Sequence, residues 1–320
     1  PLKAEKNNKY EFSLFHLYQN WGKYPIKQIS SIAFHVSYYH LSTGVTESNC
    51  IAPYYVYGKD GWTLPDFRGC SGTMWSGQPQ FNSVGRVYFT KHKDSDGNFV
   101  LSEYTHSDIH SSGNTYADID YAYIADDGSY KYNLRHFELP QTDENRTMYE
   151  LSLEFLKDIE FSDVKNELSL FSFDGRFVTF SKASYLAENN TQKVIENSNT
   201  DVSSDLYILG KNTPYFSYYD FEYNNGDTTN GMNFALIIRD SSVTVGGESW
   251  DGNLVFKNEF DGSLNVGTLS LNMDSTTFKK GDTIKLNLIL LPYGLPNADD
   301  SSNVDYVIED SVKYPFTLIA

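Results

Sequence analysis

The sequence has few cysteines and no long apolar run, and both shortages exclude classes of protein. Its two cysteines, Cys50 and Cys70, form neither a CxxC pair nor a zinc-finger spacing. They are either the ends of one disulfide, which would add about 3 kcal/mol of stability, or two buried thiols. The longest apolar run lies within residues 284–292 and is too short to cross a bilayer, so no membrane span is expected. The chain starts at Pro1 without a signal peptide, as expected of a mature or excised segment.

Basic residues are also scarce. The chain has 25 Lys and Arg against 42 Asp and Glu, a formal net charge of −17. Such a surface repels phosphate backbones, and no Lys/Arg-rich stretch offsets it, so we expect no nucleic-acid partner. The motifs GxGxxG, GxxxxGK[ST], HExxH and GxSxG are absent, which argues against nucleotide-dependent and α/β-hydrolase enzymes.

Aromatic residues, in contrast, are abundant. Phe, Trp and Tyr make up 16% of the chain, with 25 Tyr and 21 Phe. Flat amphipathic rings suit half-buried sheets, because the ring packs while a Tyr hydroxyl reaches water. They also suit sugar binding, in which a ring face packs against the C–H face of a pyranose.

Short alternating segments recur along the chain and predict strands, as in Leu269-Ser270-Leu271. Turn sequences separate them, among them Asp126-Asp127-Gly128 and Asp251-Gly252, where Gly supplies the positive φ of a tight turn. Residues 143–157 resemble a helix in composition, but 149–155 alternate and predict a strand. The only helix that we expect covers residues 182–188.

This pattern predicts an all-β fold. It is either one large antiparallel β-sandwich, supersandwich-like in its number of strands, or two packed jelly-roll or sandwich units. The polar segment 188–204 is the best candidate for a linker or long loop. We therefore expect one β-sandwich region over residues 1–187, carrying the candidate site, and a second over 205–320, unless 1–320 is one continuous domain.

The sharpest cluster of reactive side chains is His106, Asp108 and His110. In an extended strand, alternate positions share a face, so these three groups could relay a proton or bind a divalent metal. Asp118 and Asp120 could add carboxylates. The run Ser111-Ser112-Gly113-Asn114 follows directly and favours a loop. In addition, His40 and Glu47 could form an acid–base pair across a hairpin.

Residues 58–82 form the second candidate site. The segment is predicted to be a long irregular loop, and long ordered loops are often functional. Its indoles could stack on a sugar ring while its charged and amide groups bond the hydroxyls. The expected substrate-binding residues are Trp62, Asp66, Arg68, Trp75, Gln78 and Gln80. The alternative is a flap that covers a sheet edge.

No cofactor is clearly indicated. The turn Asp94-Ser95-Asp96-Gly97-Asn98 resembles a calcium-binding turn but lacks the Glu of an EF-hand. A hairpin turn explains it better, and Ca²⁺ or Zn²⁺ stays an open alternative.

Together these features favour an extracytoplasmic or cell-surface β-sandwich that binds or processes carbohydrate, with a glycan or polysaccharide as partner. The alternative is a non-enzymatic structural or adhesive module of a surface or virion, which a homo-oligomer in solution would favour.

Overall fold

The computed structural model describes the backbone of residues 28–35, 40–47, 50–56, 64–75, 78–113, 116–138, 147–175, 178–197, 202–223, 232–260 and 265–294. It describes side chains for most of these residues between 87 and 290. Within this part of the chain there are 24 strands and one short helix, α1 (Val164–Glu167). All strand pairs in the two large sheets are antiparallel, which confirms the predicted all-β sandwich.

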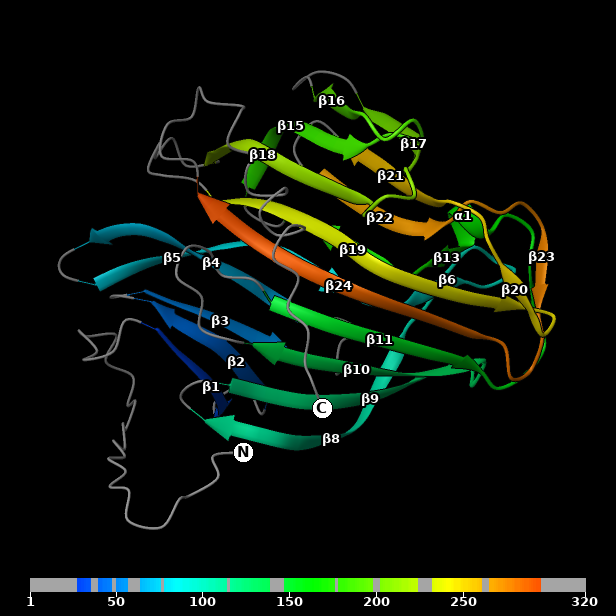
Figure 1. Ribbon diagram of the computed structural model, residues 1–320, viewed down its shortest axis with the longest axis horizontal. Helices are drawn as coiled ribbons and strands as arrows, with labels where there is room; N and C mark the ends of the chain where they lie inside the picture. Colours follow the sequence, from blue (N-terminus) through cyan, green and yellow to red (C-terminus); the bar gives the residue numbers. More distant parts are fainter. Residues whose placement is uncertain are drawn as a thin grey trace, which may run out of the picture.

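The two large sheets are layered face to face (Figure 1). One has nine strands, in the order β1 (Gln28–His35), β2 (His40–Glu47), β3 (Cys50–Val56), β4 (Leu64–Trp75), β5 (Gln78–Tyr88), β14 (Phe171–Asp174), β22 (Asn265–Leu271), β21 (Leu254–Phe260) and β17 (Ser203–Ile208). The other has ten, in the order β16 (Gln192–Glu196), β15 (Val178–Leu186), β18 (Tyr215–Tyr223), β19 (Met232–Val245), β24 (Thr283–Gly294), β11 (Thr147–Phe155), β10 (Tyr130–Glu138), β9 (Tyr116–Ala125) and β8 (Ser102–Gly113).

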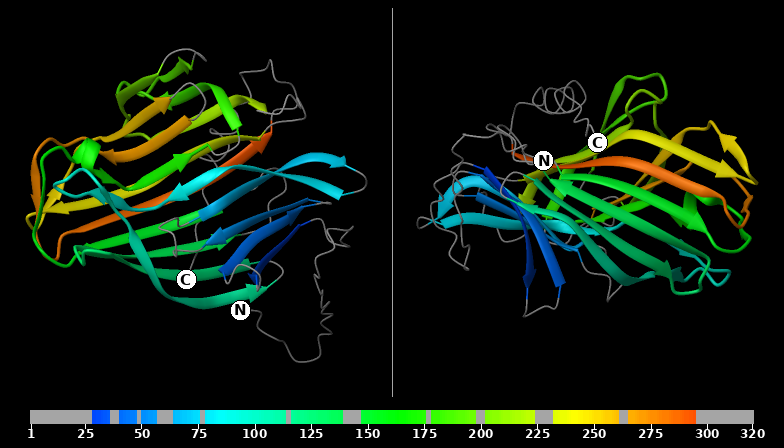
Figure 2. Two further views of the ribbon diagram at one scale, coloured as in Figure 1. Left: turned by 180° about the vertical axis from the view of Figure 1, so that it is seen from behind. Right: turned by 60° about the horizontal axis from the view of Figure 1, so that its bottom comes forward.

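The remaining strands are short and lie outside the main order of the two large sheets. β20 (Glu248–Trp250) pairs with the end of β19. Two small sheets join β12 (Ile159–Phe161) to β23 (Thr276–Phe278), and β13 (Leu168–Ser169) to β6 (Lys91–Lys93) and β7 (Phe99–Val100). The views in Figure 2 show the two large sheets from behind and from below. In the described residues, no helix is long and apolar enough to span a membrane.

The core lies between the two large sheets and is built largely from aromatic rings. Phe173 of the nine-stranded sheet stacks on Phe234 of the ten-stranded sheet, with ring centroids 4.4 Å apart. Phe216 and Phe256 form a second stack across the sheets, at 4.3 Å. All four rings are fully buried. The abundance of aromatics therefore serves sheet packing first.

Strand alternation sets which residues enter this core. On β10, Tyr132 and Leu134 are buried, while Lys131 and Asn133, which alternate with them, are exposed. The same alternation on β11 buries Leu151 and Leu153 and confirms the strand predicted over residues 149–155. The polar residues that alternate with these buried residues face outward and form the other surface of the sheet.

Three local predictions were wrong. Residues 182–188, expected to form a helix, belong mostly to β15, because pairing with β16 and β18 on either side overrides a weak local preference. The presumed linker 188–204 contains β16. Residues 58–82, expected to form a loop, contain all of β4 and the start of β5. The Gly and Pro residues of these strands are tolerated because three register shifts interrupt the pairing.

Strands from both sides of residues 188–204 share each large sheet: β14 pairs with β22, and β24 pairs with β11. The proposed division of the chain into regions 1–187 and 205–320 stays a prediction.

Candidate functional site

The predicted histidine cluster lies on β8, which continues as a strand to Gly113, so the expected loop after His110 is wrong. Alternation along this strand is broken, however. Its register against β9 shifts between Tyr104 and His106 and again between Ile109 and Ser111. The first shift lies before His106, so His106 and Asp108 keep their regular alternation, whereas the second shift places His110 at a bulge.

The two imidazoles consequently have different partners. The Nε2 atom of His110 lies 2.6 Å from Oδ2 of Asp120 on β9. This hydrogen bond raises the pKa of His110 above its usual value. His106 Nε2 lies 3.9 Å from Asp108 Oδ2, and both side chains are largely exposed, at 66% and 71%. The structure therefore brings His110 together with Asp120 and leaves His106 and Asp108 in solvent.

Next to this pair lies a buried carboxylate that is already neutralised. The Asp118 side chain is 4% exposed and accepts two hydrogen bonds from Arg135, at 2.9 and 2.8 Å. Arg135 also lies 3.6 Å from Glu150. In the part of the chain with described side chains, no group of three His, Cys, Asp or Glu residues is arranged to hold a metal ion.

The remaining predicted residues lie in strands whose backbone alone is described, or outside the described residues. His40 and Glu47 are the first and last residues of β2, so about 23 Å of extended chain separates them and they are not brought together. Trp62 lies outside the described residues. Asp66, Arg68 and Trp75 are on β4, and Gln78 and Gln80 are on β5. Trp75 and Gln78 are opposite each other in the register of these strands.

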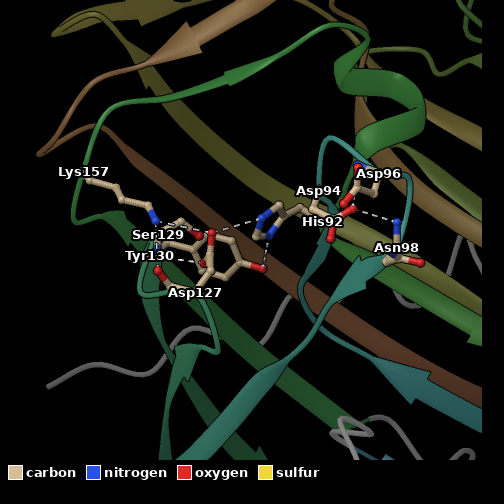
Figure 3. Close-up of polar contacts among 8 residues, drawn as sticks. All are labelled: His92, Asp94, Asp96, Asn98, Asp127, Ser129, Tyr130 and Lys157. Carbon is tan, nitrogen blue, oxygen red and sulfur yellow. Dashed lines mark hydrogen bonds and ion pairs between the residues drawn. The ribbon is translucent and has the colours of Figure 1, made fainter.

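A buried histidine, His92, lies among polar side chains (Figure 3). The His92 side chain, only 3% exposed, lies with Nδ1 3.3 Å from the Tyr130 hydroxyl and Nε2 3.6 Å from Oδ2 of Asp127. Lys157 reaches the same carboxylate from the solvent side, at 3.4 Å. The nearby Asp94 carboxylate accepts the backbone N–H groups of Asp96 and Asn98, as a hairpin turn requires. This cluster is structural, because its imidazole is sealed from solvent.

An open pocket of about 250 Å³ lies on the C-terminal half of the chain. It lies where two connections cross between the large sheets: residues 209–214 from β17 to β18, and residues 251–253 from β20 to β21. The middle of β19 supplies the third side. Ile238, Val243 and Leu254 are buried beneath it and form an apolar floor.

A β-bulge aims the polar groups of β19 at this pocket. Against β24, Ile238 is opposite Leu288 and Asp240 is opposite Asn287, so Arg239 is an extra residue without a paired position. Arg239, Asp240 and Ser241 all line the pocket. Bulges of this kind redirect side chains and are frequent beside functional sites.

The indole of Trp250 forms a wall of the pocket. It is half-buried, packs against the main core and is opposite Val243 in the β19–β20 pairing. Gly252 lies directly against the ring, because a Cβ at this position would overlap the indole atoms. The absence of a side chain at residue 252 therefore leaves the room that the ring needs in this position, where it lines the pocket.

Polar groups surround the indole. Lys211 donates from Nζ to the carboxylate and the carbonyl of Asp251, at 2.9 and 2.8 Å, and ties the two inter-sheet connections together. Asn253 donates from its side-chain amide to the Leu209 carbonyl at 2.7 Å, which joins the same two connections a second time. The pocket thus offers a fixed aromatic ring with carboxylate, hydroxyl and cationic groups around it, which suits a small polyhydroxylated ligand.

Sequence reasoning missed this site. In the sequence, Asp251-Gly252 predicts only a hairpin turn, and the predicted sugar-stacking indoles are Trp62 and Trp75. The available signal was the fourth tryptophan, Trp250, directly before that Asp-Gly pair in Gly247-Glu248-Ser249-Trp250-Asp251-Gly252. Gly252 follows Trp250 by two residues, and a Gly so placed indicates that the indole ring approaches the backbone closely.

The chain matches no protein-family model and no curated protein. Solved structures with a similar arrangement include the GH36 α-galactosidase AgaB of Geobacillus stearothermophilus, with 8% identity, 82% of this chain and 40% of that chain covered, and a TM-score of 0.43. The α-galactosidase of Lactobacillus brevis has 8% identity to this chain and a TM-score of 0.43, and the match covers 83% of this chain and 39% of that chain. A TPR-domain containing protein of Parabacteroides distasonis has 9% identity and a TM-score of 0.41, and the match covers 81% of this chain and 48% of that chain.

The chain therefore spans less than half the length of each of these proteins. At such identities and TM-scores, the likeness carries no argument about what this chain binds.

Proposed function

We propose that this protein is a carbohydrate-binding β-sandwich and that the Trp250 pocket is its binding site. The observation that carries the proposal is a half-buried indole, packed closely against Gly252, in a pocket that combines polar side chains with an apolar floor. The all-β sandwich agrees with this function but does not determine it.

The chemistry of a sugar ring suits these walls. The C–H face of a pyranose is weakly positive and apolar, so it packs on the electron-rich face of an indole. Its hydroxyls both donate and accept hydrogen bonds. The exposed Asp240 carboxylate can accept from them, and the hydroxyl of Ser241 can do either. Because the indole is already ordered by packing, little rotamer entropy is lost on binding.

The proposal is one of binding. Catalytic roles for His106, Asp108, His110, His40 and Glu47 stay predictions, as does a second sugar-binding surface formed by Trp62, Asp66, Arg68, Trp75, Gln78 and Gln80. An extracytoplasmic or cell-surface location belongs to the same proposal. The alternative of a structural or adhesive module without a ligand is an outcome of the test below.

The test is binding of the folded protein to a glycan array, followed by titration of any glycan retained. Trp250→Ala should lower affinity at least tenfold, because it removes the stacking surface, while Trp250→Phe should keep part of it. Tyr104→Ala is the matched control: Tyr104 is an aromatic residue on β8 with 38% of its surface exposed. Its loss should leave binding unchanged.

Three results bear on the proposal. Equal loss of binding in the Tyr104→Ala and Trp250→Ala variants would point to a surface spread over the sheets. Loss in Trp62→Ala and Trp75→Ala alone would move the site to the first half of the chain. If the folded protein binds no glycan, a structural module becomes the better reading.

A further inference from the structure

The size of the Trp250 pocket limits how much of a glycan it can hold. Pockets for drug-sized molecules measure roughly 300–1,000 Å³, and this pocket encloses about 250 Å³. The connections 209–214 and 251–253 wall it on two sides, where a groove for a continuous chain would be open. The space suits one sugar ring with its neighbours outside.

The charges of the pocket balance. Lys211 and Arg239 supply two positive charges, and Asp240 and Asp251 supply two negative charges. The Lys211 ammonium is already paired with Asp251, in contact with both its carboxylate and its carbonyl oxygen. Arg239 also takes part in an interaction within the protein. With two cations against two carboxylates, the pocket has no excess of positive charge to attract an anionic ligand group.

The rest of the molecule adds a repulsive field. The net charge of −17 disfavours the approach of a uronic acid or a sulfated sugar. The exposed Asp240 carboxylate acts in the same direction at short range, because its nearest described partner is the backbone N–H of Ser241, at 2.9 Å, and not a cation.

We infer that the pocket selects a single neutral sugar unit at the end of a glycan chain and rejects both acidic sugars and internal chain segments. This inference rests on the proposed function and names the ligand class of the same site. The terminal ring stacks on Trp250, its hydroxyls meet Asp240 and Ser241, and the remainder of the chain leaves through the open mouth of the pocket.

The experiment compares matched ligands by titration calorimetry. The first pair is an oligosaccharide that ends in a neutral hexose and the same oligosaccharide ending in the corresponding uronic acid. The neutral form should bind at least tenfold more tightly at low salt, and the difference should shrink as salt screens the repulsion. Asp240→Asn should reduce the same difference. The second pair is a linear and a cyclic oligosaccharide of the same sugar, of which only the linear one should bind.

The outcomes separate this inference from the proposed function. Equal affinity for neutral and acidic ends, or binding of the cyclic oligosaccharide, would overturn the inference. If Trp250→Ala abolished that binding, the proposed function would stand. Absence of binding to every linear and cyclic glycan would overturn both. A preference for neutral ends that survives in Trp250→Ala would place the selective site elsewhere and likewise overturn the inference.

Discussion

The Nδ1 atom of His92 lies 3.3 Å from the hydroxyl oxygen of Tyr130, in a space from which water is almost completely excluded. The imidazole also meets the rings of Tyr130 and Phe161 edge to face, with centroids 5.4 and 5.8 Å apart. His92 thus serves as a packing ring that carries two hydrogen-bonding atoms. Burial lowers the pKa of His92, although the Asp127 carboxylate opposes this shift. The folded state therefore favours the neutral imidazole.

The first prediction is that acid destabilises the fold through His92. Because the folded pKa lies below the ordinary value of 6.5, the unfolded chain takes up a proton in a range where the folded imidazole does not. The unfolding free energy should fall as the pH drops below 6.5, by up to about 1.4 kcal/mol for each pH unit until the folded pKa is reached. Urea unfolding at pH 7.5, 6.5 and 5.5 measures this dependence, and His92→Phe should remove that part of it.

The opposite sign is expected for His110, which is the second prediction. The hydrogen bond to Asp120 raises the pKa of this imidazole, so its stabilising effect is present below pH 6.5 and is lost as the pH rises through the folded pKa. His110→Ala should therefore reduce stability at pH 5.5 more than at pH 8. If both histidine variants changed the pH dependence in the same direction, one of the two assignments would be wrong.

Much of the fold could be predicted from the sequence, because alternation is a local signal. The strand at Tyr149–Phe155 alternates strictly, and β11 has the same alternation in the structure. Positions of side chains around irregularities could not be predicted. One extra residue at Arg239 turns the following polar groups toward the pocket, and a register shift on β8 between Ile109 and Ser111 sets His110 off from His106 and Asp108. A bulge depends on the partner strand, which sequence periodicity does not contain.

The Trp250 site shows the same limit in another form. Its walls come from residues 209–214 and 251–253, which are joined only when β17 and β21 pair in one sheet and β18 and β19 pair in the other. Nothing in the local pattern around Lys211 or Asp251 indicates that these two side chains meet. The site is a product of topology.

The third prediction concerns the buried Asp118–Arg135 pair. Arg135→Met would leave the 4%-exposed Asp118 carboxylate without its two hydrogen-bond donors. A loss of about 2–3 kcal/mol in unfolding free energy is expected, because a buried charge that loses its ion-pair partner is costly. Lys131→Met on the same strand is the control. Its ion pair with Glu154 is about half exposed on both sides and should contribute about 0–1 kcal/mol. Equal effects of the two variants would contradict the prediction.

The fourth prediction concerns the turn that positions β20. The buried Asp282 carboxylate accepts the backbone N–H groups of Gly246, Gly247 and Lys279, at 2.7–2.8 Å. Gly246 and Gly247 have φ of 62° and 83°, as a tight hairpin turn requires. Asp282→Ala would leave three donors without an acceptor and should cost about 3 kcal/mol in denaturant unfolding. Asp274→Asn, at a 92%-exposed carboxylate, should change stability by less than about 1 kcal/mol.

The fifth prediction tests whether Gly252 holds the indole of the pocket. A Cβ at residue 252 would overlap the ring of Trp250, so Gly252→Ala should displace the indole and weaken glycan binding at least tenfold. With fluorotryptophan incorporated at the 4 tryptophans, one fluorine resonance should shift, and Trp250→Phe identifies it.

The matched control for this prediction is Gly97→Ala. Gly97 has φ of 81° but no atom within 4 Å of a Cβ, so the substitution strains a turn without touching an indole. It should cost about 1–2 kcal/mol of stability and leave the Trp250 resonance and glycan binding unchanged, because backbone strain at a distant turn does not reach the ring. If Gly252→Ala left the resonance in place, the indole would not depend on the missing side chain, and the preorganised stacking surface on which sugar binding is proposed would have to be sought in other contacts of Trp250.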